Sequence, residues 1–84
     1  MSRKISGDAE LVFRKEFGRR LKELRVGKGL TQTEFAGRIS LQLLAVQRYE
    51  AGQRLPDVYL LRRIASEFGC NLHWLICGEE SEGV

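Results

Sequence analysis

The side chains that could perform catalysis or hold a metal are few in this chain. His73 is the single histidine, and Cys70 and Cys77 are the two cysteines. A hydrolytic triad would need this histidine beside a nucleophile on a strained turn, and the sequence carries no such signature. The three residues supply three ligands at most, whereas a structural zinc site takes four. We therefore expect two free thiols and a histidine on a helix surface, with no metal, no cofactor and no enzymatic activity.

The charges of the 84-residue chain are divided unevenly between its two ends. All 14 Lys and Arg residues and seven of the 11 acidic residues lie within residues 1–63, whereas residues 64–84 hold four acids and no base. A basic front suits a polyanion, and residues 79–84 form an acidic tail. The first ten residues lack the apolar core of a secretory signal, and no apolar run is long enough to span a bilayer. These features predict a single cytoplasmic domain.

Every apolar pattern in the chain has helical spacing, which predicts an all-α fold of five short helices. Residues 1–8 are expected to form a flexible basic arm, with Asp8 able to cap a first helix over residues 9–25. Its stripe consists of Leu11, Phe13, Phe17, Leu21 and Leu24. The later helices are predicted over residues 32–39, 42–50, 57–68 and 71–77, so the compact domain covers residues 9–78.

The second and third predicted helices, within residues 32–50, form a helix-turn-helix pattern. Thr31 and Glu34 have the spacing of a capping box, which predicts the start of the first of these helices at Gln32. A tight turn over residues 38–41 leads to the next helix, which turns Val46 and Tyr49 inward and Leu44, Gln47 and Arg48 outward. Such a pair can place the end of its first helix at a DNA phosphate and its second helix in the major groove.

Three segments of the sequence resemble the lambda-repressor-like family, which comprises the Cro, phage-repressor and xenobiotic-response-element type of helix-turn-helix transcriptional regulators. The resemblance covers roughly residues 17–79 and implies a compact five-helix DNA-binding domain. The segments are Leu24-Arg25 with Gly29-Leu30-Thr31-Gln32-Thr33-Glu34-Phe35-Ala36, then Val46-Gln47-Arg48-Tyr49-Glu50-Ala51-Gly52, then Leu72-His73-Trp74-Leu75-Ile76-Cys77-Gly78-Glu79.

The resemblance also implies roles for individual residues. An internal ion pair is expected between Arg25 and Glu50. The base-contacting positions of the family fall on Gln42, Leu43, Leu44, Gln47 and Arg48, and its phosphate-contacting positions fall on Gln32, Gln53 and Arg54. Structural alternatives stay open: Gln32 as an exposed first-turn residue, Arg48 as a solvated side chain, and the stripe from Leu11 to Phe17 as core or as a dimer surface.

The sequence departs from the family pattern at three places. Ser40 stands where a glycine is usual in the turn, and Gln42 stands where a Ser or Thr usually caps the third helix, so Ser40 is an alternative cap. Leu43 and Leu44 replace polar base-reading residues. A leucine can touch a thymine methyl group, but it makes no hydrogen bond to a base. These two leucines could pack on DNA, on the N-terminal arm or on a protein partner.

Together, these observations predict a sequence-specific DNA-binding transcriptional regulator that acts as a repressor. One such domain reads only a few base pairs, so a homodimer on an inverted-repeat operator is expected. The alternative is a helix-turn-helix fold used as a protein-interaction module, such as an antitoxin-type partner. Leu43 and Leu44 favour this alternative, whereas Gln32, Arg48, Arg54 and the basic front favour DNA.

Overall fold

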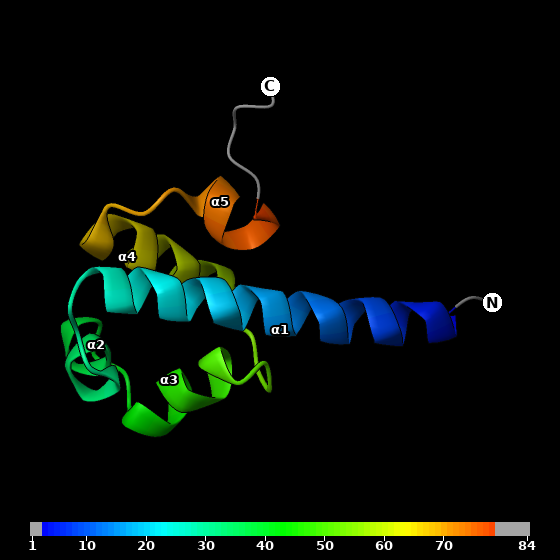
Figure 1. The fold of residues 1–84 in the computed structure, drawn as a ribbon, viewed down its shortest axis with the longest axis horizontal. Coiled ribbons are helices and arrows are strands. Elements are labelled where there is room, and N and C mark those ends of the chain that lie inside the picture. The colour runs from blue at the N-terminus through cyan, green and yellow to red at the C-terminus, as the bar shows by residue number, and fades with distance from the viewer. Residues whose placement is uncertain (1–2, 79–84) are drawn as a thin grey trace.

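The computed structural model describes residues 3–78, and all regular elements in that range are α-helices (Figure 1). They are α1 (Arg3–Gly27), α2 (Gln32–Arg38), α3 (Leu43–Glu50), α4 (Val58–Phe68) and α5 (Leu72–Cys77). The predicted all-α class with five helices is therefore confirmed. No helix within this range is both long enough and apolar enough to cross a membrane. The acidic tail predicted for residues 79–84 lies outside the described residues.

Side-chain caps mark the starts of α2, α4 and α5 at the predicted residues. Thr31 Oγ1 accepts a hydrogen bond from the Glu34 N–H at 3.1 Å, and Glu34 Oε1 accepts one from the Thr31 N–H at 2.9 Å, which completes the capping box of α2. Asp57 Oδ1 accepts from the Leu60 N–H at 2.8 Å and caps α4. Asn71 caps α5 in the same way. These side chains satisfy backbone donors that have no partner within their own helix.

The first helix begins earlier than predicted. The sequence predicts a flexible arm over residues 1–8 and a helix from about Ala9. In the structure, α1 already starts at Arg3 and contains Asp8 as an interior residue. Nothing in residues 3–8 interrupts a helix, because the segment has no proline and a single interior glycine costs only about 1 kcal/mol. Extending an existing helix also adds one hydrogen bond per residue without a new nucleation step.

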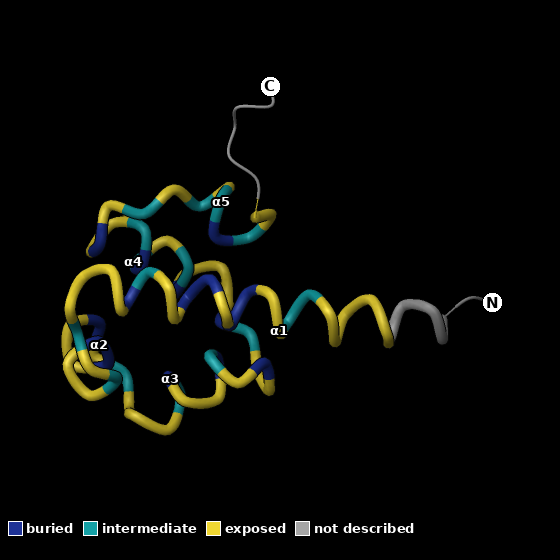
Figure 2. Tube along the Cα trace, in the orientation of Figure 1, coloured by how far each residue is buried: buried dark blue, intermediate teal, exposed yellow. Residues whose placement is uncertain are grey.

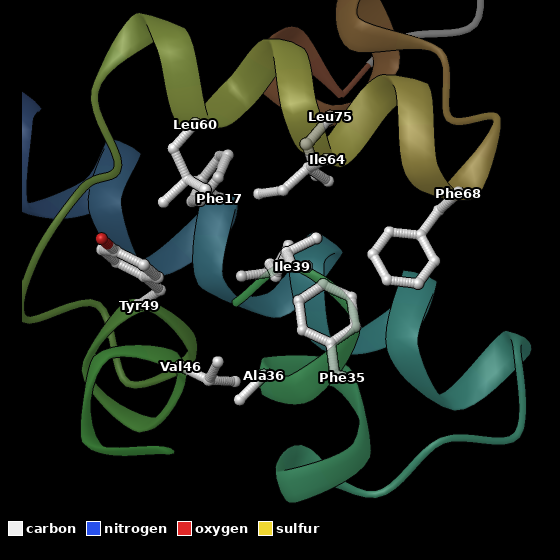
Figure 3. Close-up of a cluster of buried hydrophobic side chains, with 11 residues drawn as sticks. Phe17, Phe35, Ala36, Ile39, Val46, Tyr49, Leu60, Ile64, Phe68 and Leu75 are labelled. Carbon is white, nitrogen blue, oxygen red and sulfur yellow. The ribbon is translucent and has the colours of Figure 1, made fainter. Parts of the chain in front are cut away.

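The hydrophobic core lies between the second half of α1 and the other four helices. Phe17 and Leu21 face inward from α1, and the Phe35 and Phe68 rings stack with centroids 4.6 Å apart (Figure 3). Leu11 is 41% exposed and Phe13 is half-buried outside the core, so the predicted apolar stripe enters the core only from Phe17 onward. The described part of α1 before the core is mostly exposed (Figure 2). The fully buried large side chains are Phe17, Leu21, Phe35, Ile39, Val46, Ile64 and Leu75.

Two glycines allow α1 to approach α3 and the turn that follows it. A Cβ atom on Gly18 would lie 2.5 Å from the Tyr49 carbonyl oxygen and 2.6 Å from that of Glu50. A Cβ atom on Gly52, whose φ is 76°, would lie 2.8 Å from Cγ of Lys15. Arg14 Nε donates a 3.0 Å hydrogen bond to the Gly52 carbonyl across the same contact. The end of α3 is therefore held directly against the backbone of α1.

Candidate nucleic-acid interface

The turn between α2 and α3 is closed by backbone hydrogen bonds and by one left-handed residue. Ser40 has a φ of 58°, a conformation that costs a residue with a side chain about 1–2 kcal/mol. The Leu41 N–H donates to the Ala36 carbonyl at 2.8 Å, and the Leu41 side chain packs against the core. Gln42 is the N-cap of α3 and its side chain makes no capping bond. The alternative in which Ser40 caps an earlier start of α3 is therefore wrong.

The helix α3 has one buried face and one exposed face, and the exposed face carries both polar and apolar side chains. Val46 and Tyr49 lie in the core, as predicted. Leu43 and Leu44 are 40% and 50% exposed, so this face of α3 carries apolar as well as polar side chains. All five positions expected to contact bases are exposed. Gln42 lies just before α3, and the other four lie within it: Leu43, Leu44, Gln47 and Arg48. A major groove is wide enough to accept a helix presented in this way.

The turn after α3 carries the two expected phosphate contacts that follow this helix. Gln53 and Arg54 are both exposed. The Gln53 N–H donates to the Arg48 carbonyl at 2.9 Å, so only the side chain of Gln53 remains to bind a phosphate. The Arg54 guanidinium has no hydrogen-bond or ion-pair partner among residues 3–78. These two side chains therefore extend the exposed surface of α3 with further hydrogen-bond donors, and Arg54 adds a positive charge.

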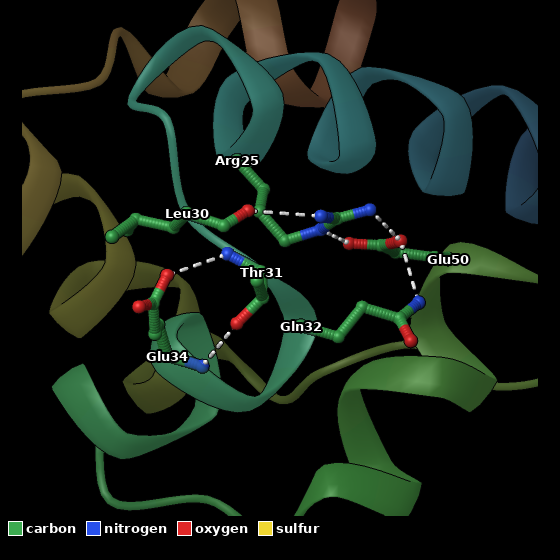
Figure 4. Close-up of polar contacts among 6 residues, drawn as sticks. All are labelled: Arg25, Leu30, Thr31, Gln32, Glu34 and Glu50. Carbon is green, nitrogen blue, oxygen red and sulfur yellow. Dashed lines mark hydrogen bonds and ion pairs between the residues drawn. The ribbon is translucent and has the colours of Figure 1, made fainter.

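The remaining expected phosphate contact, Gln32, lies inside a buried cluster with Arg25 and Glu50 (Figure 4). Arg25 Nε donates to Glu50 Oε2 at 2.6 Å and Arg25 Nη2 donates to Glu50 Oε1 at 3.0 Å, so the expected ion pair is bidentate. The side chains of Arg25 and Glu50 are only 11% and 6% exposed. The hydrogen bond and charge of Glu50 raise the pKa of Arg25, although desolvation opposes this. Gln32 Nε2 donates to the same Glu50 Oε1 at 3.0 Å.

Sequence reasoning missed two features of this region. The bond from Gln32 to Glu50 joins residues 18 positions apart, and no local spacing rule predicts it. The residue Arg20 is 4% exposed and bonds to carbonyls at the end of α5, whereas periodicity alone marks an arginine on α1 as a surface residue. Both contacts depend on how the helices pack against one another.

The two cysteines and the histidine are not assembled into a site within residues 3–78. Cys70 and Cys77 are free thiols, the first half-buried and the second exposed. In the described part of the chain, no three His, Cys, Asp or Glu side chains are grouped as metal ligands would be. Burial raises the pKa of the Cys70 thiol, and the positive charge of Lys28 partly offsets this.

The fold and this surface define a helix-turn-helix domain. A helix-turn-helix family model matches residues 21–75, which is more than half of the chain, and the protein belongs to the lambda-repressor-like helix-turn-helix family. This membership confirms the predicted family. This helix-turn-helix family comprises transcriptional regulators.

Three similar proteins carry names of the same kind. The HTH-type transcriptional activator BcrR of Enterococcus faecalis is 34% identical over 65 residues, which are 77% of this chain and 32% of that protein. The uncharacterized HTH-type transcriptional regulator YqaE of Bacillus subtilis is 35% identical over 68 residues, 81% of this chain and 59% of that one. The prophage-derived regulator YonR of the same species is 29% identical over 66 residues, covering 79% and 61%. The match thus spans between a third and three-fifths of these relatives.

Proposed function

We propose that this protein is a sequence-specific DNA-binding transcriptional regulator that reads the major groove with α3. The observation that carries the proposal is the exposed surface formed by Gln42, Leu43, Leu44, Gln47 and Arg48. In this proposal Arg48 recognises guanine, and the two leucines contact thymine methyl groups. Gln32, Gln53 and Arg54 bind phosphates and fix the register of the domain on the duplex. The names of the relatives, all HTH-type transcriptional regulators, support the same conclusion.

The regulator is proposed to act as a homodimer in the cytoplasm. One α3 reads only a few base pairs, so two domains on half-sites about one helical turn apart would provide the specificity that one lacks. Repression is the proposed mode, because occupancy of an operator by such a dimer is sufficient to block a promoter. One relative is named an activator, and a reporter assay with the operator placed upstream of or across a promoter separates the two modes.

Selection of binding sites from random-sequence DNA tests the proposal. The expected result is an enriched inverted repeat, bound with two protein chains per duplex and much more tightly than unselected DNA. Enrichment of a single half-site, bound by one chain, would contradict the dimer. No enrichment at all would contradict the function.

The competing proposal is a protein-interaction module that uses Leu43 and Leu44 as its contact surface. The 40% and 50% exposure of these two apolar side chains favours it. In that case Leu43→Ala and Leu44→Ala would abolish the binding of a protein partner, while Arg48→Ala and Arg54→Ala would leave that binding unchanged.

A further inference from the structure

The Glu50 carboxylate holds a side chain of the proposed DNA surface in addition to its ion-pair partner. Glu50 Oε1 accepts hydrogen bonds from Arg25 Nη2 and from Gln32 Nε2, both at 3.0 Å, and Oε2 accepts from Arg25 Nε at 2.6 Å. Arg25 also donates through Nη1 to the Leu30 carbonyl at 3.0 Å (Figure 4). One buried carboxylate thus connects the end of α1, the start of α2 and the end of α3.

The hydrogen bond to Glu50 determines the orientation of the Gln32 side-chain amide. A carboxylate only accepts hydrogen bonds, so it binds the NH2 end of the amide and disfavours the carbonyl end. A phosphate oxygen has the same requirement. The Nε2 atom carries two hydrogens, and one of them stays available when the other is bound to Glu50. A Gln32 held by Glu50 therefore keeps a donor at the surface, whereas an unheld amide can turn and present its oxygen to the phosphate.

Few side chains near Gln32 could replace it as a hydrogen-bond donor to a phosphate. Leu43 and Leu44, on the exposed side of α3, have no polar atoms. The carboxylate of Glu34 has no hydrogen to donate, and the Thr31 hydroxyl oxygen accepts the Glu34 N–H in the capping box of α2. The bidentate pairing with Arg25 also balances the negative charge of Glu50, which would otherwise oppose an approaching phosphate.

We propose that Glu50 is a positioning residue for DNA binding, which acts by orienting the Gln32 amide toward a phosphate. The proposal rests on the proposed function, in which Gln32 is a phosphate contact. Freeing one long side chain before binding weakens affinity by about two- to tenfold, so this is the size of the effect expected from losing the contact. The weakening should be the same on the selected site and on random DNA, because a phosphate carries no sequence information.

A double-mutant cycle on the folded protein tests this role. The affinities for the selected site and for random DNA are measured for the parent, Glu50→Gln, Gln32→Ala and the double variant. The expected result is that Glu50→Gln weakens binding to both DNAs in the parent but has no further effect when Gln32 is already alanine. Equal weakening in both backgrounds would overturn the proposal, since it would mean that Glu50 acts only through the fold. The matched control is Glu67→Gln, which makes the same charge change in the exposed Arg38–Glu67 pair.

A second measurement does not depend on how well Glu50→Gln folds. In the unmodified protein without DNA, NMR of the side-chain amides compares Gln32 with the exposed Gln53. The proposal expects one Gln32 Nε2 hydrogen to exchange more slowly than those of Gln53, and Gln32 signals that match those of Gln53 would overturn it. Failure of the proposed function has a different signature, in which the parent and Gln32→Ala both bind no DNA while the Gln32 hydrogen is still protected.

Discussion

The guanidinium of Arg20, on α1, binds the carbonyl groups at the end of α5. Its Nε donates to the Leu75 carbonyl and its Nη2 donates to the Ile76 carbonyl, each at 2.9 Å. These carbonyls have no partner within their own short helix, and a positive charge at a helix C-terminus is also favourable. The side chain of Arg20 is buried, so water cannot replace the contact. Arg20 of α1 thus holds the C-terminal end of α5 against α1.

Arg20→Ala is expected to lower the free energy of unfolding by about 2–4 kcal/mol, because two charge-assisted hydrogen bonds are lost and buried carbonyls are left without donors. Denaturant melts measure the loss, and hydrogen exchange should show α5 opening first. The control is Arg19→Ala, which removes an exposed pair with Glu23 and should cost under about 1 kcal/mol. Equal losses for the two variants would contradict the proposed fastening of α5.

Glu50→Ala is expected to cost about 3–5 kcal/mol of stability, because it leaves the buried Arg25 guanidinium without its counter-charge. The measurement is again a denaturant melt, with Glu67→Ala as the control for an exposed ion pair. A loss below about 1 kcal/mol for Glu50→Ala would mean that water reaches the pair and replaces the carboxylate.

Arg48→Ala is expected to reduce the preference for the selected site over random DNA more than Leu44→Ala does. A good bidentate contact to a base is worth about 1–3 kcal/mol of discrimination, whereas the burial of one thymine methyl group contributes about 0.8 kcal/mol. Competition binding with both DNAs measures the two effects. If Leu44→Ala has the larger effect, apolar contacts rather than Arg48 dominate recognition.

Arg54→Ala and Gln32→Ala are expected to differ in their salt dependence. Removing a cationic phosphate contact lowers the slope of log affinity against log salt by about one unit, whereas removing the neutral Gln32 should leave the slope unchanged. Both variants should weaken binding to selected and random DNA alike. Titrations at several salt concentrations decide the matter, and an unchanged slope for Arg54→Ala would place this residue away from phosphates.

Cys77 is expected to react with a thiol reagent faster than Cys70 at mildly alkaline pH. The reactive species is the thiolate, and burial raises the pKa of Cys70, so less of its thiolate is present at a given pH. Because the folded state then holds this proton more tightly than the unfolded state, the contribution of Cys70 to stability falls as the pH rises above the pKa of the unfolded thiol. Labelling of Cys70→Ser and Cys77→Ser measures the two rates, and a faster reaction at Cys70 would contradict the argument.

The sequence predicted those parts of the fold that depend on neighbouring residues. The starts of α2, α4 and α5 were predicted because Thr31, Asp57 and Asn71 act within one helical turn. The exposed side of α3 was predicted because helical periodicity assigns Val46 and Tyr49 to the core. The predicted start of α1 was wrong, because Asp8 lies inside the helix and does not cap it.

The contacts of the candidate site were harder to predict from the sequence. The Arg25–Glu50 pair was expected from the resemblance to the family, and periodicity alone would not have joined these residues. The bond from Gln32 to Glu50 was not expected, because it requires the packing of three helices to be known. Ser40 stands where a glycine is usual, yet it adopts a left-handed conformation, because the packing of Leu41 and the backbone hydrogen bonds around it determine the turn.

Gly18 has no side chain that could bind a ligand, but its small size lets α1 pack closely behind α3, the proposed reading helix. The backbone carbonyls of Tyr49 and Glu50 lie so close to it that one additional methyl group would push the end of α3 away from α1. In the proposed complex with DNA, the spacing between α1 and α3 at Gly18 would therefore help to set how deeply α3 enters the groove. Variation at this one position could retune recognition while every residue that faces the DNA stays the same.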